Sequence, residues 1–328
     1  MPEDHLLTID QLLWLVLGGT IAVALALDLL VFNRRSHAPT VREAAIYSAF
    51  YVGLGLLFGG LVFATRGVSD GSAYLAGYLL ELSLSVDNVF VFALIFAAFA
   101  VPLPYQHRVL FYGILGAIVF RAIFIGLGAA IIESFHAAIY VFGVLLLITG
   151  YRMWSQRNEE MLDPTGNPLL RLFRRFVPTT DGYREHRFVV REGGRRLATP
   201  LMAVLVVVES SDILFAIDSV PAIFSVTTDT FLVFSSNAFA ILGLRSLYFL
   251  LAGAVHRFRY LKPGLAALLV FAGIKILVAD IVKISIPVSL AIIVAILAFA
   301  IGGSVLADRM DRRRAAGTPA GRPSSGPT

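Results

Sequence analysis

Nine long apolar stretches dominate this 328-residue sequence and restrict what it can fold into. Each is about 20 residues long and lacks strict alternation of apolar and polar residues, which predicts membrane-spanning helices rather than strands. They cover residues 10–31, 44–64, 73–100, 109–132, 136–154, 198–220, 229–251, 264–282 and 287–307. The hydrophobic content of 58% and the mean hydropathy of +0.81 agree with this class. The sequence therefore predicts an all-α polytopic membrane protein with nine transmembrane helices.

Basic residues are distributed unevenly between the loops on the two sides of these helices. One side receives 22 of the 27 Lys and Arg residues, and the other receives only Arg66 and Lys283. Cytoplasmic loops are enriched in basic residues, so we expect the N-terminus outside and the C-terminus in the cytoplasm. Because the net charge of +5 is concentrated in particular loops, it does not indicate a nucleic-acid partner. The expected surroundings are a lipid bilayer.

Changes in composition divide the chain into four parts. Residues 1–155 form an N-terminal membrane half with helices 1–5, and residues 198–307 form a C-terminal half with helices 6–9. Between them, residues 156–197 mix Arg with Glu, Asp, Gly and Pro, and predict either a small basic cytoplasmic subdomain or a solvated linker. Residues 308–328 are rich in Arg, Ala, Gly, Pro and Ser, which predicts a disordered cytoplasmic tail.

The two membrane halves resemble each other. The segment around Asp87 aligns with the segment around Asp212, since each aspartate has a nearby serine before it and a phenylalanine three residues after it. Arg121 follows Asp87 by 34 residues, and Arg245 follows Asp212 by 33. Each unit contains three helices, so the second copy enters the membrane from the opposite side. We therefore expect an inverted repeat that relates helices 3–5 to helices 6–8.

Charged residues inside the apolar stretches are the strongest functional feature. A charge at bilayer depth costs about 2.5–3.5 kcal/mol on insertion scales, so such residues are rare and are often functional. Six acids face three bases, which leaves three excess negative charges if all are ionised. The acids are Asp28, Glu81, Asp87, Glu209, Asp212 and Asp218, and the bases are Arg121, Arg245 and Lys275. Protons or a bound cation must balance this excess.

The residue types favour a hard divalent cation. Carboxylate, amide and hydroxyl oxygens suit Mn²⁺, Mg²⁺ or Ca²⁺, and the chain has no cysteine for a soft metal. A straight helix places Asp87 about 120° from Glu81, so local unwinding near Pro221 and the serine pairs would be needed to turn all the acids inward. A simpler alternative is that buried Asp–Arg pairs only hold the helices together. Asp28 could also lie at the membrane interface.

The acidic motifs resemble those of the TerC/Alx family of integral membrane proteins, which lies near the LysE-type exporters. The matching patterns are Asp28-Leu, Glu81-x5-Asp87-Asn88, Phe120-Arg121, Glu209-x2-Asp212-x2-Phe215-x2-Asp218-Ser219-x-Pro221-Ala222 and Asn237-x5-Gly243-Leu-Arg245-Ser-Leu-Tyr248. The resemblance spans nearly all of residues 20–305. It implies association with Mn²⁺ efflux, with tellurium-resistance loci and with metal supply to exported proteins. It also implies a bacterial inner (cytoplasmic) membrane.

The resulting hypothesis is a secondary transporter that exports a divalent metal cation, with Mn²⁺ first and protons as the coupling ion. The expected metal residues are Glu81, Asp87, Asn88, Glu209, Asp212 and Asp218, and the expected charge-balancing residues are Arg121, Arg245 and Lys275. We expect no enzymatic activity and no resident cofactor, because catalytic and nucleotide-binding motifs are missing from the sequence. Two alternatives remain: a membrane scaffold or metal-supply partner without flux, and a membrane hydrolase with paired aspartates.

Overall fold

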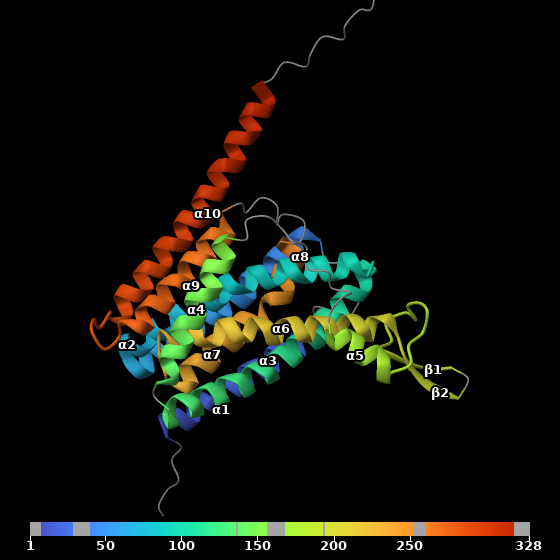
Figure 1. The fold of residues 1–328 in the computed structure, drawn as a ribbon, viewed down its shortest axis with the longest axis horizontal. Coiled ribbons are helices and arrows are strands. Elements are labelled where there is room, and N and C mark those ends of the chain that lie inside the picture. The colour runs from blue at the N-terminus through green and yellow to red at the C-terminus, as the bar shows by residue number, and fades with distance from the viewer. Residues whose placement is uncertain are drawn as a thin grey trace, which may run out of the picture.

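Helices make up most of the computed structural model, which describes residues 8–28, 40–135, 137–155, 168–192, 194–251 and 260–317. The elements in these residues are α1 (Ile9–Leu27), α2 (Val41–Ala98), α3 (Leu103–Ser134), α4 (Ala138–Ser155), α5 (Pro168–Phe176), β1 (Val189–Glu192), β2 (Arg195–Ala198), α6 (Pro200–Phe224), α7 (Thr230–Leu242), α8 (Leu244–Leu251), α9 (Leu261–Leu277) and α10 (Ile286–Gly317). Figure 1 shows α10 extending away from the helix bundle. The β1–β2 hairpin lies at one end of the bundle, near α5.

Gly67 reverses the direction of the chain inside α2. Its φ of 86° and ψ of −176° lie in a region that glycine adopts without steric strain and other residues avoid. The two arms then pack antiparallel, with Gly55 against Tyr78 and Gly59 against Tyr74. The Tyr74 hydroxyl donates a 2.9 Å hydrogen bond to the carbonyl oxygen of Gly55. The two arms contain the predicted segments 44–64 and 73–100.

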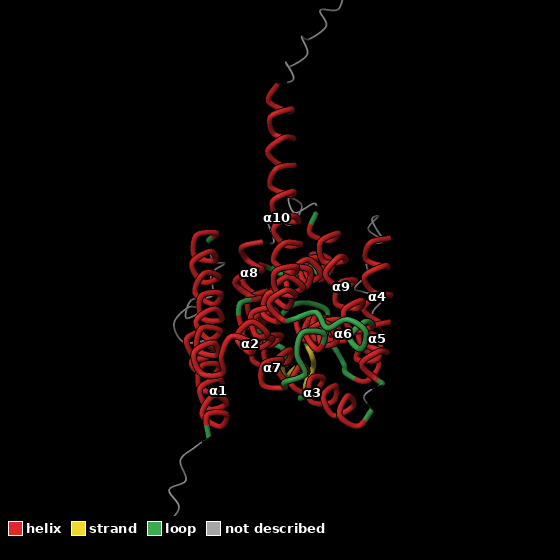
Figure 2. Tube along the Cα trace, turned by 90° about the vertical axis from the view of Figure 1, so that its left-hand side faces the viewer, coloured by secondary structure: helices red, strands yellow, loops and turns green. Residues whose placement is uncertain are grey.

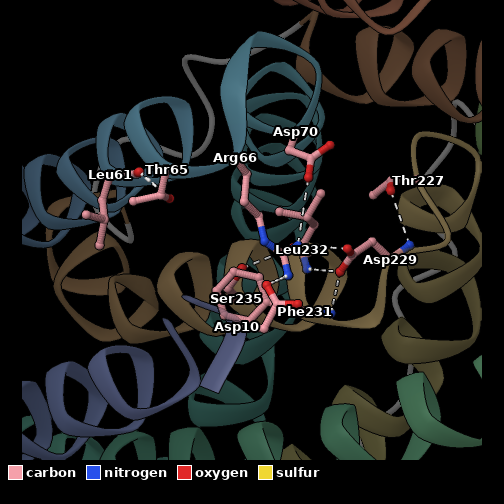
Figure 3. Close-up of polar contacts among 10 residues, drawn as sticks. All are labelled: Asp10, Leu61, Thr65, Arg66, Asp70, Thr227, Asp229, Phe231, Leu232 and Ser235. Carbon is pink, nitrogen blue, oxygen red and sulfur yellow. Dashed lines mark hydrogen bonds and ion pairs between the residues drawn. The ribbon is translucent and has the colours of Figure 1, made fainter. Parts of the chain in front are cut away.

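Arg66 stands at this reversal and joins three helices (Figure 3). Its guanidinium lies 2.6 Å from Asp10 of α1, 2.8 Å from Asp229 and 3.8 Å from Asp70. It also lies 4.8 Å from the centre of the Phe231 ring. Asp229 is the N-cap of α7, and its other carboxylate oxygen accepts from two backbone amides of the first turn. The Arg66 cluster therefore fixes the start of α7 against α1 and α2.

Helix α6 packs against both α2 and α3. Close approach of α3 depends on small residues, since Gly113 faces Val208 and Gly128 faces Phe224. Figure 2 shows α1 at one edge of the bundle, on the side opposite α4. Helices α4 and α9 pack against each other in antiparallel directions, and Gly143 of α4 faces Ile276 of α9.

The described residues contain six helices that are long and apolar enough to cross a membrane, or seven if α7 and α8 form one span bent by 41°. This supports a multi-pass helical membrane protein. Nine spans stay a prediction, because α2 is one 58-residue element and α9 has only 17 residues. The helices matched by the predicted repeat, α2 with α6, α3 with α7 and α4 with α9, do contact each other. The inverted repeat itself stays a prediction.

The predicted basic loop and tail contain regular structure where they are described. Within 156–197, α5 and a two-stranded antiparallel hairpin precede α6, and Leu170 of α5 is buried. Residues 156–167 and 193 lie outside the described residues. At the other end, α10 continues past Ala307 to Gly317, so the first part of the predicted tail is helical. Residues 318–328 lie outside the described part.

The Arg66 cluster leads to a prediction that separates helix capping from ion pairing at Asp229. Asp229→Asn keeps a good N-cap and removes the charge facing Arg66, so stability should fall by about 0.5–1 kcal/mol. Asp229→Ala removes the cap as well and should cost about 1 kcal/mol more. Thermal unfolding in detergent at low and high salt measures both effects. Equal losses for the two variants would contradict the double role of this carboxylate.

Candidate functional site

A buried arginine lies where α2, α3 and α6 meet. Arg121 of α3 is 1% exposed, and its Nη1 atom forms an ion pair with Glu81 of α2, which is fully buried. The same nitrogen donates a 2.9 Å hydrogen bond to the hydroxyl of Ser219 on α6. Its other terminal nitrogen, Nη2, lies 3.5 Å from Asp212 of α6. One guanidinium is thus shared by two carboxylates from different helices.

The amide of Asn237 completes this group from α7. Its nitrogen donates a 3.1 Å hydrogen bond to the second carboxylate oxygen of Glu81. Its own oxygen is buried and has no hydrogen-bond partner in the described structure. We call Glu81, Arg121, Asp212, Ser219 and Asn237 the Arg121 centre. In the described structure neither oxygen of Asp212 has a hydrogen bond, so the acceptor capacity of the centre is incompletely used.

Helical spacing explains why only some of the predicted metal residues reach the centre. Asp87 follows Glu81 by six residues, and Asp218 follows Asp212 by six. Six residues of a straight α-helix turn the side chain to a position about 120° away. Both α2 and α6 stay helical through these segments, and no unwinding occurs near Pro221. Therefore α2 directs Glu81 inward and Asp87 elsewhere, and α6 directs Asp212 inward and Asp218 elsewhere.

Asp87 and Asp218 have surroundings separate from the Arg121 centre. Asp87 is partly exposed and interacts electrostatically with Lys262 of α9, whose ammonium lies 5.0 Å from the centre of the Phe90 ring. Asn88, the next residue in the sequence, is buried. Asp218 accepts a 3.0 Å hydrogen bond from Thr149 of α4. These side chains stay candidate metal residues, but the structure does not gather them around Arg121.

Glu209 lies one turn before Asp212 on α6 and points at α3. A β-carbon added to Gly116 would lie 2.1 Å from one of its carboxylate oxygens, which only glycine permits. The other oxygen is buried without a hydrogen-bond partner in the described structure. The glycine was recognisable in the sequence only as part of a Gly-rich face of α3. Its contact with Glu209 needed the tertiary structure.

The other two charge-balancing residues lie apart from the centre. Arg245, in the first turn of α8, forms an ion pair with Asp28 at the end of α1. Asp28 is thus buried and paired. Lys275 of α9 is half-buried, and no ion pair links it to another described residue. The sequence-based site list contained charged residues and Asn88 but not Ser219 and Asn237, although both residues belong to the motifs that match the family.

Taken together, the centre can hold positive charge among oxygen atoms. Within the described residues, no three His, Cys, Asp or Glu side chains are grouped closely enough to hold a metal ion. Arg121 instead supplies the positive charge between Glu81 and Asp212. The fold and the centre define a multi-pass helical membrane protein with charged side chains buried between its helices.

The chain belongs to the TerC family of integral membrane proteins, whose family model matches residues 66–314. This confirms the resemblance seen in the acidic motifs. The chain is 51% identical over 297 residues to the uncharacterized membrane protein STKORF319 of Myxococcus xanthus. This alignment covers 90% of this chain and 93% of the relative. The chain is 48% identical over 295 residues to Alx of Escherichia coli K12, provisionally named a membrane-bound redox modulator, covering 87% and 92%. No solved structure matches the chain.

The contact between Gly116 and Glu209 gives a prediction with a matched control on the same helix. Gly116→Ala places a methyl group on the Glu209 carboxylate, so Glu209 has to move and the melting temperature should fall. Gly126→Ala meets nothing within 4 Å and should raise helix stability by about 0.5–1 kcal/mol. Thermal unfolding of the two variants in detergent measures the difference. Equal behaviour would mean that Glu209 does not occupy the space beside Gly116.

Proposed function

We propose that this protein is a secondary transporter that exports a divalent metal cation, with Mn²⁺ as the first candidate. The observation that carries the proposal is the convergence of Glu81 and Asp212 from two helices in a buried centre where they share one arginine. Two carboxylates and one guanidinium leave an excess negative charge if all three are ionised. Such an excess is costly in a low-dielectric interior and favours uptake of a cation.

The side chains of the Arg121 centre have suitable chemistry for this cargo. Besides the two carboxylates, Ser219 offers a hydroxyl oxygen and Asn237 an amide oxygen that has no hydrogen-bond partner in the described structure. Hard divalent ions prefer oxygen ligands of this kind. The zero cysteine count makes a soft-metal cargo a poorer match. In the observed arrangement, Arg121 supplies the positive charge between the two carboxylates.

Loading a cation then requires Arg121 to withdraw and further ligands to approach. Glu209 is the nearest additional carboxylate along α6, and Asp87, Asn88 and Asp218 are candidates that need a rearrangement of α2 or α6. In the cation-free state Arg121 balances the charge of the centre, and Arg245 balances Asp28. Lys275 of α9 is a further positively charged side chain that would balance the acids when no metal is bound. Each of these roles is part of the proposal.

Protons are the proposed coupling ion. Carboxylates that bind a metal must be deprotonated, so binding of the cation releases protons and protonation helps its release. The centre has no histidine among its members, so its acids are the groups that would exchange protons. Inward movement of protons would then drive outward movement of the metal. A transporter of this kind needs only the bilayer, the cation and protons as partners.

Export also requires an orientation, and we propose an inner-membrane protein with its N-terminus outside and its C-terminus in the cytoplasm. Because the sequence has no cysteine, single introduced cysteines report on accessibility without background. Ser69→Cys, near the Gly67 reversal, should react with a membrane-impermeant thiol reagent added outside intact cells. A cysteine inserted after Arg313 should react only after the membrane is opened. The reverse pattern would contradict the orientation and the export direction.

The competing proposal is a membrane scaffold or a metal-supply partner without flux. The observation in its favour is that every ion pair of the Arg121 centre would also hold α2, α3 and α6 together. The provisional name of the Escherichia coli relative points to redox modulation. In this chain such a role would have to proceed without thiols, because the printed sequence has no cysteine.

Flux measurements in proteoliposomes separate these proposals. The purified protein should move Mn²⁺ faster when a pH gradient drives protons in the opposite direction, and Asp212→Asn should lower the flux by about 10- to 100-fold while the protein stays folded. The control is Glu133→Gln, which neutralises an exposed acid at the end of α3 and should leave flux unchanged. Absence of Mn²⁺ flux from the folded wild-type protein would overturn transport. Flux that ignores the pH gradient would overturn proton coupling.

A further inference from the structure

A small enclosed cavity lies beside the Arg121 centre, between α2, α3, α6 and α8. Its volume is about 10 Å³, which is close to the space that one water molecule needs. Apolar side chains such as Phe92 and Leu110 form part of its wall. Two side chains of opposite charge, Asp212 and Arg245, also line it. The cavity therefore separates an acid of the centre from an arginine whose observed partner is elsewhere.

Both charged side chains have unused hydrogen-bonding atoms. Neither carboxylate oxygen of Asp212 has a hydrogen-bond partner, and the Nη1 atom of Arg245 has none within the described structure. The two side chains are 3% and 8% exposed, so water outside the bundle does not compensate them. Arg245 uses its other terminal nitrogen, Nη2, for the ion pair with Asp28. It thus faces one acid directly and another across the cavity.

Asp212 is the less satisfied of the two acids that share Arg121. Its distance from Arg121 is 3.5 Å, whereas Glu81 and Ser219 hold the other terminal nitrogen of that guanidinium. An ion pair that loses one partner in a buried site typically costs 3–5 kcal/mol, because the remaining charge is uncompensated. If Arg121 withdrew from Asp212, another cation would be needed nearby. Arg245 is the charged group that shares the cavity with it.

Arg245 lies at a break in the helical path. Arg245 is the second residue of α8, directly after the 41° bend that separates this helix from α7. An arginine side chain is long, and its guanidinium offers five donors, so a modest rotation can exchange one carboxylate for another. The cavity provides unfilled space on the side where Asp212 lies.

We propose that Arg245 is a switching counter-ion that pairs with Asp28 in this state and with Asp212 when Arg121 withdraws. Arg245 acts as a positioning residue, since it neutralises Asp212 in the step in which Arg121 has withdrawn and no cation is bound. The exchange lets the centre empty without leaving Asp212 as an unpaired buried charge. This inference rests on the proposed function only for its role in cation release. The exchange itself is testable without metal.

A double-mutant cycle on thermal stability in metal-free detergent provides that test. Asp28→Asn alone leaves Asp212 as a partner for Arg245, and Asp212→Asn alone leaves Asp28. The double variant leaves Arg245 with neither carboxylate, so its melting temperature should fall several degrees more than the sum of the single effects. The weakened contact between Asp212 and Arg121 is present in both the single and the double variant, and therefore cancels in the cycle.

The matched control cycle combines Asp28→Asn with Glu81→Gln. Glu81 pairs with Arg121 rather than with Arg245, so these two changes should be additive. Additive losses for Asp28 and Asp212, or equal coupling in the control cycle, would overturn the exchange. Failure of only the Asp28/Asp212 double variant to fold, with the single variants and the control double variant folded, would be the strongest form of the expected coupling.

Mn²⁺ binding provides a second test, which also works if Asp212→Asn does not fold. Asp28→Asn frees Arg245 to compete for Asp212, so Mn²⁺ affinity should fall about tenfold or more. Adding Arg245→Gln to Asp28→Asn should restore it. Wild-type affinity in Asp28→Asn, or no recovery in the double variant, would overturn the switch. If the wild-type protein binds no Mn²⁺, the proposed function fails, while the metal-free cycle still decides the exchange.

Discussion

A single buried guanidinium holds the middle of this bundle together. Arg121 is nearly without solvent contact and is reached by side chains from α2 and α6, while α7 secures Glu81 through Asn237. A buried charge without partners is far more costly than one within an ion pair, so the rotation of each helix about its axis is constrained by this group. Apolar packing alone would specify that rotation weakly, because these helices are hydrophobic on most sides.

Polar contacts along α7 and α8 connect this centre to both ends of α1. Asp229 caps α7 and binds Arg66, which also binds Asp10 near the start of α1. Eight residues after the cap, Asn237 of the same helix reaches Glu81. Beyond the bend, Arg245 pairs with Asp28 at the end of α1. A movement of α7 and α8 would therefore affect the Arg66 cluster, the Arg121 centre and the contact with α1 together.

The polar atoms of the Arg121 centre are unevenly satisfied. Both oxygens of Glu81 accept hydrogen bonds, whereas Asp212 and Asn237 retain oxygen atoms that have none in the described structure. Arg121 supplies the positive charge between the two carboxylates.

The amino-acid sequence by itself determined the membrane class, the mostly helical structure, the family and the charged residues within the apolar segments. These follow from local composition and spacing, as in the acids of α2 and α6. Only the tertiary structure decided that Glu81 rather than Asp87 meets Asp212 near Arg121, and that Arg245 pairs with Asp28. In a helix that is apolar on most sides, periodicity does not show which side faces the bundle, and that choice depends on partners distant in the sequence.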